Sequence, residues 1–316
     1  MVGGLVKKLV LGVGLVSTAS LLGGCSLYQG GSLSRLGMGD PELQLPSECV
    51  DVNYAGKYPS GEETTTKFVD CITSRGTHIL KEYKDWAIFE AQYEFVPEGV
   101  AKDPTYQGGW GSRLDGDKKK LIIPKDCNKI LNIGKAGTRK YIACEMQEGT
   151  YLLREFSDWK VFQASYIFSK DAKTGLKYQG GWNSRLGGKA QVLPMPQGCE
   201  IIKHIGRTGN KKYVDCTTKE GLRMLKEFKD WGVLEASYIF TDDAKDGFRY
   251  QGGLVSRFGG EPQKLKLPDD CLKIKNVGRS ASTKYVVCEN SSGEDFLKEY
   301  SDLGVFEATY RFVTEK

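Results

Sequence analysis

Residues 106–114 read YQGGWGSRL, and the same segment returns as YQGGWNSRL at 178–186 and as YQGGLVSRF at 250–258. These three copies follow one another at a period of 72 residues without a gap, and a fourth copy, YQGGSLSRL, stands at 28–36. A fixed period of this length is typical of repeat architectures, in which neighbouring copies of one supersecondary unit bury a common core. The fold therefore depends on the structure that one unit adopts.

The end of each unit carries the clearest secondary-structure pattern. Residues 154–168 read REFSDWKVFQASYIF, and residues 226–240 read KEFKDWGVLEASYIF. From Val161 to Phe168 apolar side chains fall on alternate positions, which is typical of a strand with one buried face. The residues between two cysteines, such as 201–214, predict a hairpin that turns near 207–210. We therefore predict a mostly β fold.

One segment leaves a second fold class open, because Leu152, Leu153, Phe156 and Trp159 also fit helical spacing. The alternative is an α+β fold with one short helix in each repeat. After a segment 1–24, the repeats span 25–105, 106–177, 178–249 and 250–316. The joints between them are short and polar, so we expect neighbouring units to touch, as blades around a common axis or along a row, in preference to separate beads.

The N-terminus resembles the signal peptide and lipobox of bacterial lipoproteins. Lys7 and Lys8 precede an uncharged stretch, 9–22, which is shorter than the roughly 20 residues that cross a bilayer as a helix. The stretch ends in LGGC at 22–25, with small residues before the cysteine. The resemblance implies cleavage before Cys25 and attachment of acyl chains, such as palmitate, which anchor stably in twos or threes. Because serine and leucine follow the cysteine instead of aspartate, it also implies the outer membrane.

The other eight of the nine cysteines fall into four pairs. The pairs are Cys49/Cys71, Cys127/Cys144, Cys199/Cys216 and Cys271/Cys288, and the last three share a spacing of 17 residues. An even number of cysteines in an exported chain predicts disulfides, most simply one in each repeat. Zinc is the competing interpretation, but the sequence has no C-x-x-C pair and only two histidines. A disulfide closing such a loop contributes on the order of 3 kcal/mol.

Opposite charges recur at fixed positions of the repeat. They are Arg35, Arg113, Arg185 and Arg257; Glu82, Glu155, Glu227 and Glu299; and Asp85, Asp158, Asp230 and Asp302. We expect these residues to pair with each other, inside a unit or across the joint between units. The alternative is a row of arginines presented to an anionic ligand.

Two further recurring features have a structural and a functional interpretation. The double glycine of YQGG predicts a turn or a close backbone approach that a Cβ would block, since no phosphate-binding glycine motif surrounds it. Trp110 and Trp182 share a position that holds Leu254 in the last copy. Replacement by leucine favours apolar packing, and an exposed aromatic binding platform is the alternative.

Little in the sequence indicates catalysis or a cofactor. His78 and His204 stand at non-equivalent positions of different copies, and a nucleophile needs a base within reach. We expect no metal and no cofactor, and the modest net charge of +5 with no long basic run argues against nucleic acid. The sequence favours a lipid-anchored envelope repeat protein that acts as a binding or structural surface module, with a protein, a glycan or copies of itself as partner. The alternatives are a self-assembling envelope subunit or, through carboxylates such as Glu227 and Asp230, a glycan-directed enzyme.

Overall fold

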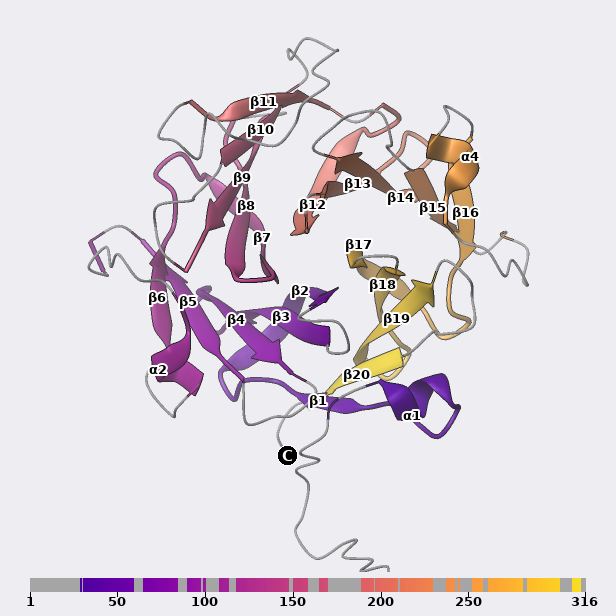
Figure 1. The fold of residues 1–316 in the computed structure, drawn as a ribbon, viewed down its shortest axis with the longest axis horizontal. Coiled ribbons are helices and arrows are strands. Elements are labelled where there is room, and N and C mark those ends of the chain that lie inside the picture. Colours follow the sequence, from indigo (N-terminus) through magenta and orange to yellow (C-terminus); the bar gives the residue numbers. More distant parts are fainter. Residues whose placement is uncertain are drawn as a thin grey trace, which may run out of the picture.

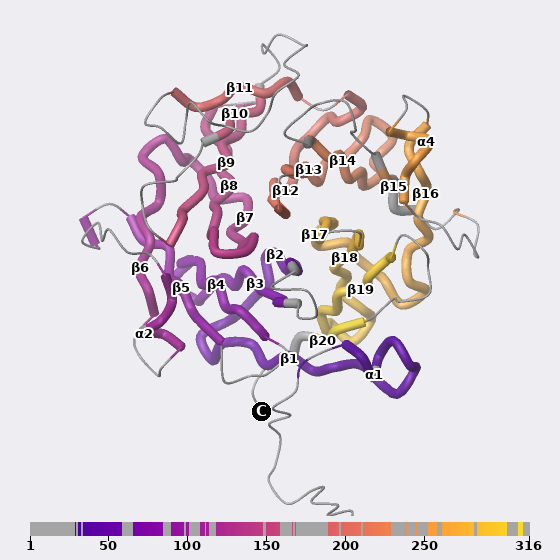
Figure 2. The backbone as a smooth tube through the Cα atoms, in the orientation of Figure 1, coloured from indigo at the N-terminus to yellow at the C-terminus, as the bar shows by residue number. Residues whose placement is uncertain are grey.

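The chain forms a ring of four β-sheets around one axis (Figures 1 and 2). The computed structural model describes residues 29, 31–59, 65–84, 90–97, 99–100, 108–113, 118–147, 150–158, 165–169, 189–195, 197–209, 211–229, 237–241, 244, 252–257, 261–280, 283–301 and 309–313. Sheets arranged radially in this way define a four-bladed β-propeller. The predicted mostly β fold is confirmed, and the units stand as blades around a common axis.

Each blade has four antiparallel strands and a fifth, outer strand that pairs in parallel with the fourth. The first blade contains β2 (Cys49–Pro59), β3 (Thr65–Thr73), β4 (His78–Tyr83), β5 (Gln92–Val96) and β6 (Lys119–Ile122). The second contains β7 (Lys129–Ala136), β8 (Arg139–Glu145), β9 (Thr150–Phe156), β10 (Ser165–Ser169) and β11 (Gln191–Pro194). The third contains β12 (Ile201–Thr208), β13 (Lys211–Thr217), β14 (Arg223–Lys229), β15 (Ser237–Thr241) and β16 (Gln263–Lys266). The fourth contains β17 (Lys273–Ser280), β18 (Thr283–Glu289), β19 (Asp295–Ser301), β20 (Thr309–Val313) and β1 (Glu42–Gln44).

The segment with ambiguous periodicity is a strand, because Leu152, Leu153 and Phe156 belong to β9. Short helices occur elsewhere, in the four residues that follow YQGG. They are α1 (Ser32–Arg35), α2 (Trp110–Arg113) and α4 (Leu254–Arg257).

The blades are offset from the sequence repeats, because each outer strand comes from the repeat that follows. Leu121 of β6 thus pairs with Phe95 of β5 and is buried. In the last blade β1 takes this place, with Leu43 opposite Phe312 of β20. The beginning of the first repeat therefore closes the ring.

Tyrosines fill the axis of the ring. Tyr213 crosses Gly206 of the neighbouring inner strand, where a Cβ would overlap its ring, and Tyr141 and Tyr285 cross their glycines in the same way. The Tyr213 hydroxyl lies 2.8 Å from that of Tyr54 and 2.9 Å from that of Tyr285. Since these three hydroxyls come from the first, third and fourth blades, they can meet only at the axis. Burial raises the pKa of Tyr54 and Tyr213, so both hydroxyls stay neutral.

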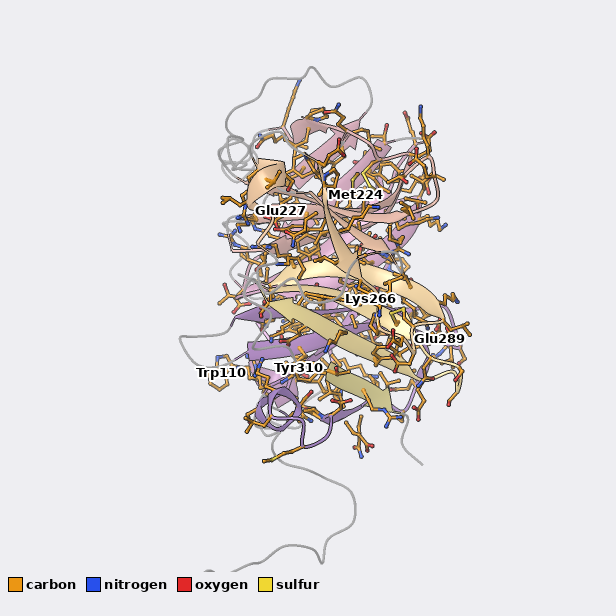
Figure 3. The ribbon with its side chains drawn as sticks, turned by 90° about the vertical axis from the view of Figure 1, so that its right-hand side faces the viewer. Trp110, Met224, Glu227, Lys266, Glu289 and Tyr310 are labelled. Carbon is orange, nitrogen blue, oxygen red and sulfur yellow. A yellow bond between two sulfur atoms is a disulfide. The ribbon has the colours of Figure 1, made fainter. Side chains whose placement is uncertain are left out.

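The ring has two faces that differ in what they carry (Figure 3). The helix face carries α1, α2 and α4, and the side view shows Trp110 at its edge, with Glu227 toward the same side. The disulfide face carries the cysteine pairs and the turns between the second and third strands of the blades, and Glu289 marks it in the same view. Between blades the core is aromatic, as where the rings of Phe95 and Phe156 meet edge-on at 5.8 Å.

Candidate functional site

The recurring charged residues gather at the four junctions between neighbouring blades. Each junction contains a glutamate from the third strand, a tyrosine from the fourth, a cation from the next inner strand and a lysine from the next second strand. The glutamates are Glu82, Glu155, Glu227 and Glu299; the tyrosines are Tyr93, Tyr166, Tyr238 and Tyr310; the inner-strand cations are Lys135, Arg207, Arg279 and Lys57; and the lysines are Lys140, Lys212, Lys284 and Lys67. We call these four groups the junction sets.

Each glutamate is fully buried and forms an ion pair with the next blade. Glu155 lies 3.0 Å from Nε of Arg207, and Glu227 lies 2.8 Å from Nη1 of Arg279. Glu82 pairs with Lys135 in the same way. Burial alone would raise the pKa of Glu82, but Lys135 and Arg113 outweigh it, so the pKa of this carboxyl is lowered and it stays ionised. The junction sets therefore join the blades by buried charge pairs.

The lysines of the junction sets lie over the tyrosine rings. Lys212 Nζ is 4.6 Å from the ring centroid of Tyr166, and Lys140 Nζ is 5.0 Å from that of Tyr93. Lys140 also contacts Oδ1 of Asp158 at 2.6 Å, and this aspartate is one of the four recurring aspartates. Burial lowers the pKa of Lys140 to about 8, since Asp158 offsets it only in part. The equivalents of Asp158 lie outside the described residues.

Two of the predicted arginines complete the junction sets from the short helices. Arg113 Nη2 lies 3.2 Å from Glu82, and Arg35 Nη2 lies 3.3 Å from Glu299. Arg257 approaches the hydroxyl of Tyr238 at 3.4 Å. Arg35 and Arg113 therefore form ion pairs across the joint between units, as expected. Arg185 lies outside the described residues, as does Trp182.

The expected apolar packing of Trp110 is wrong, because its side chain is 62% exposed at the edge of the helix face, and Leu254 at the same position is 50% exposed. The single-turn helix explains the difference. Its Ser112 accepts a hydrogen bond at 2.7 Å from the backbone of Gln92, and Arg113 bonds Glu82, so the first residue of the turn is directed outward.

The double glycine has the structural role predicted for it. A Cβ on Gly109 would lie 2.6 Å from the hydroxyl of Tyr93, and one on Gly253 would lie 2.7 Å from the hydroxyl of Tyr238. Gly253 also has a φ of +64°, which an L side chain rarely adopts. The second glycine of YQGG therefore lies close against Tyr93 and Tyr238.

A second set of polar contacts near the axis alternates around the ring. Asp70 accepts a hydrogen bond from the backbone of Ile133 at 2.9 Å, and Asp215 accepts one from Val277 at 3.1 Å. At the other two junctions an asparagine forms the hydrogen bonds to the backbone of the neighbouring blade. Asn132 bonds both backbone groups of Ile205, at 3.0 and 2.9 Å.

Asn276 does the same for Ala55, at 3.0 and 2.8 Å. The sequence carries a signal for this alternation, which becomes visible when equivalent positions of the four copies are compared. The position of Asp70 and Asp215 holds Ala143 and Val287 in the other two copies, whereas Asn132 and Asn276 are equivalent to Tyr54 and His204. Blades one and three supply the aspartates, and blades two and four supply the asparagines.

The two histidines, which are not equivalent in sequence, bond to equivalent aspartates. His78 Nδ1 lies 2.7 Å from Asp70, and His204 Nδ1 lies 2.8 Å from Asp215. Burial would lower the pKa of His78, but the Asp70 carboxylate raises it above the ordinary value. Arg223 also contacts Asp215, at 2.9 Å. The histidines therefore support the aspartates that join the blades.

All four predicted disulfides are present, and each joins the second strand of a blade to the start of the first strand or to the residues directly before it. The Cα–Cα distances are 5.5, 5.3, 5.6 and 5.2 Å for Cys49–Cys71, Cys127–Cys144, Cys199–Cys216 and Cys271–Cys288. These distances are ordinary for disulfides. The prediction of one bond in each repeat is confirmed.

The described residues include no group of three or more His, Cys, Asp or Glu side chains placed to hold a metal ion. In the same part of the chain no helix has the length and apolar character needed to cross a bilayer. A scan against protein-family models finds no match, and a search of curated proteins finds no similar sequence.

Proposed function

We propose that this protein is a lipid-anchored propeller of the bacterial cell envelope, attached at Cys25 to the outer membrane, which binds a protein or glycan partner through similar sectors of one rigid ring. The observation that carries the proposal is the position of the recurring charges. Each buried glutamate pairs with the blade next to it. Because these pairs hold the blades together, the four sectors keep fixed relative positions. Fixed positions allow several weak contacts to act together on one partner.

The turns of the disulfide face support a role in recognition. Gly76, Gly221 and Gly293 hold the same turn between the second and third strands, with φ of +75°, +80° and +78°. The two residues before these glycines differ, being Ser-Arg, Lys-Glu and Ser-Ser. Variable loops on a common rigid frame are typical of binding surfaces. The four disulfides support an oxidising compartment outside the cytoplasm.

Binding can be tested with the mature domain that starts after Cys25. Two probes are used separately: washed peptidoglycan sacculi and outer-membrane vesicles, with bound protein measured by cosedimentation. We expect saturable binding to one of them, and weaker binding when the turns are altered as Arg75→Glu or Glu220→Lys. If both turns contact the same partner, the fold-loss in affinity of the double variant equals the product of the fold-losses of the two single variants. The exposed Glu261→Lys, outside the turns, is the matched control.

Absence of saturable binding to both probes would overturn the proposal. The same experiments separate the alternatives. Self-association of the domain that increases with concentration in sedimentation velocity would favour an assembling subunit. Release of soluble sugar from sacculi would favour an enzyme, although the carboxylate of Glu227, one of its candidate residues, is engaged by Arg279 in the structure.

A further inference from the structure

We propose that the helix face of the ring lies against the membrane that carries the anchor, and that the disulfide face is turned away from it. This inference rests on the proposed lipid attachment at Cys25. It adds which side of the ring the bilayer contacts and which side is left free for a partner.

The chain between the lipid and the ring is short. The described chain begins at Gln29, which is buried and whose backbone oxygen accepts a hydrogen bond from Lys67 Nζ at 2.6 Å. Lys67 lies near the helix-face end of β3, paired with the last residue of β4. Cys25 precedes Gln29 by four residues, which span at most about 14 Å when fully extended.

This reach is shorter than the ring is thick. An inner strand such as β7 has eight residues and is therefore roughly 26 Å long. A lipid within about 14 Å of Gln29 cannot reach past the opposite end of such a strand. The acyl chains thus hold the helix face near the bilayer and the disulfide face away from it.

Exposed apolar side chains occur on both faces, since Val50 and Leu272 of the disulfide face are 65% and 75% exposed. The short tether therefore selects the face, and the apolar residues of the helix face supply contacts with the bilayer.

The short helices of the helix face carry exposed apolar side chains, with Trp110 at 62%, Leu254 at 50% and Val255 at 71%, and Leu36 directly after α1 at 69%. The helices α1, α2 and α4 stand at separate points around the ring (Figure 1), and Figure 3 shows Trp110 at the edge of the helix face. Apolar side chains that are spread around one face can all contact a flat surface at the same time. A peptide bound in a groove would instead need apolar side chains that lie next to one another. Tryptophan and leucine at such positions suit the headgroup level of a bilayer.

The test measures how the apolar side chains of the helix face affect partition into vesicles. The mature chain from Cys25 has one thiol outside the four disulfides, and this thiol is coupled to a maleimide lipid with a single acyl chain. One chain gives only marginal, reversible binding, so contacts of the ring become visible. Flotation with phosphatidylethanolamine and phosphatidylglycerol vesicles then gives the partition coefficient.

We expect the partition coefficient of the double variant Leu254→Ser/Val255→Ser to be about tenfold lower, because two aliphatic side chains that insert partly into the bilayer are removed. The matched control is Val50→Ser/Leu272→Ser, since these residues are 65% and 75% exposed beside the cysteines of the disulfide face. The control should partition like the parent chain. Equal losses in the two pairs, or a greater loss in the control pair, would overturn the proposed orientation.

Quenching by brominated lipids provides an independent measurement on the same vesicles. The contribution of Trp110 to the emission is the difference between the parent and Trp110→Phe, and brominated lipids should quench it strongly. The emission of a tryptophan introduced as Leu272→Trp should not be quenched. The intact mass of the full lipoprotein extracted from membranes tests the anchor separately. A mass without acyl chains would refute the proposed attachment, whereas acylation combined with quenching at residue 272 would refute the orientation alone.

Discussion

Changing Glu299→Gln tests whether buried charge pairs hold the ring closed. Glu299 lies at the junction between the last and the first blade, where it pairs with Lys57 of β2 and with Arg35 of α1. The side chains of Glu299 and Lys57 are 1% and 4% exposed, so the variant takes the carboxylate of Glu299 away from a buried ammonium group.

Removing one partner of a buried ion pair costs about 3–5 kcal/mol, most of which reflects the charge left behind. Arg35 adds little to this cost, because its side chain is 28% exposed and solvent screens it. We therefore expect a loss of about 3–4 kcal/mol in the free energy of unfolding. In a domain of this size that loss lowers Tm by about 6 °C.

Thermal unfolding of the oxidised mature domain, followed by circular dichroism, measures the change. Asp269→Asn is the matched control, because Asp269 pairs with Lys266 but is 92% exposed, and its Tm should equal that of the parent. The double variant Glu299→Gln/Lys57→Met should recover about 1–2 kcal/mol, since it also removes the buried ammonium group. Equal melting of Glu299→Gln and Asp269→Asn, or no recovery in the double variant, would refute the reasoning.

Three further predictions concern the axis, a buried carboxyl and the closing strand. Gly206→Ala places a Cβ against the ring of Tyr213, and urea unfolding should show a loss of about 2 kcal/mol; an unchanged midpoint would contradict the close approach. Burial raises the pKa of Asp295 to about 6, and Lys275 offsets this only in part. The native state therefore binds more protons than the unfolded chain between about pH 4 and 6, and the free energy of unfolding falls as pH rises through this window. Relative to Asp295→Asn, the parent should lose about 2 kcal/mol between pH 4 and pH 7 in urea unfolding, and parallel pH profiles would argue against this shift. A mature chain shortened to begin after Gln44 lacks β1 and leaves β20 as an open edge, so it should self-associate in sedimentation velocity where the intact domain does not; a monomeric shortened chain would show that β1 is not needed to protect the edge.

The features that the sequence predicts well are local. Alternation of apolar residues predicts the fourth strand of a blade, because a half-buried strand repeats every two residues. The cysteine spacing of 17 predicts the disulfides, because a hairpin of that length brings its outer ends together. The double glycine predicts a close approach, which the contact of Gly109 with Tyr93 confirms.

The features that could not be predicted depend on neighbours in space. No local pattern shows that β6 completes the blade of the preceding repeat, or that β1 completes the last one. The position of Trp110 was misjudged because replacement by leucine indicates an apolar residue without indicating what it contacts. The alternation of Asp70 with Asn132 becomes meaningful only once both are seen to bond the backbone of the next blade.

The offset between blade and repeat bears on how such a chain can evolve. The first three blades take their outer strands from the following copy, and the last takes β1 from the first copy. Duplication or loss of a whole 72-residue unit within the gene therefore leaves no blade incomplete. The closing strand at the start of the chain would still find the last blade. The tyrosines at the axis oppose such a change, since hydroxyls from the first, third and fourth blades already meet there within hydrogen-bonding distance. Strand pairing would therefore tolerate a change in the number of units, whereas the packing of tyrosines at the axis favours four.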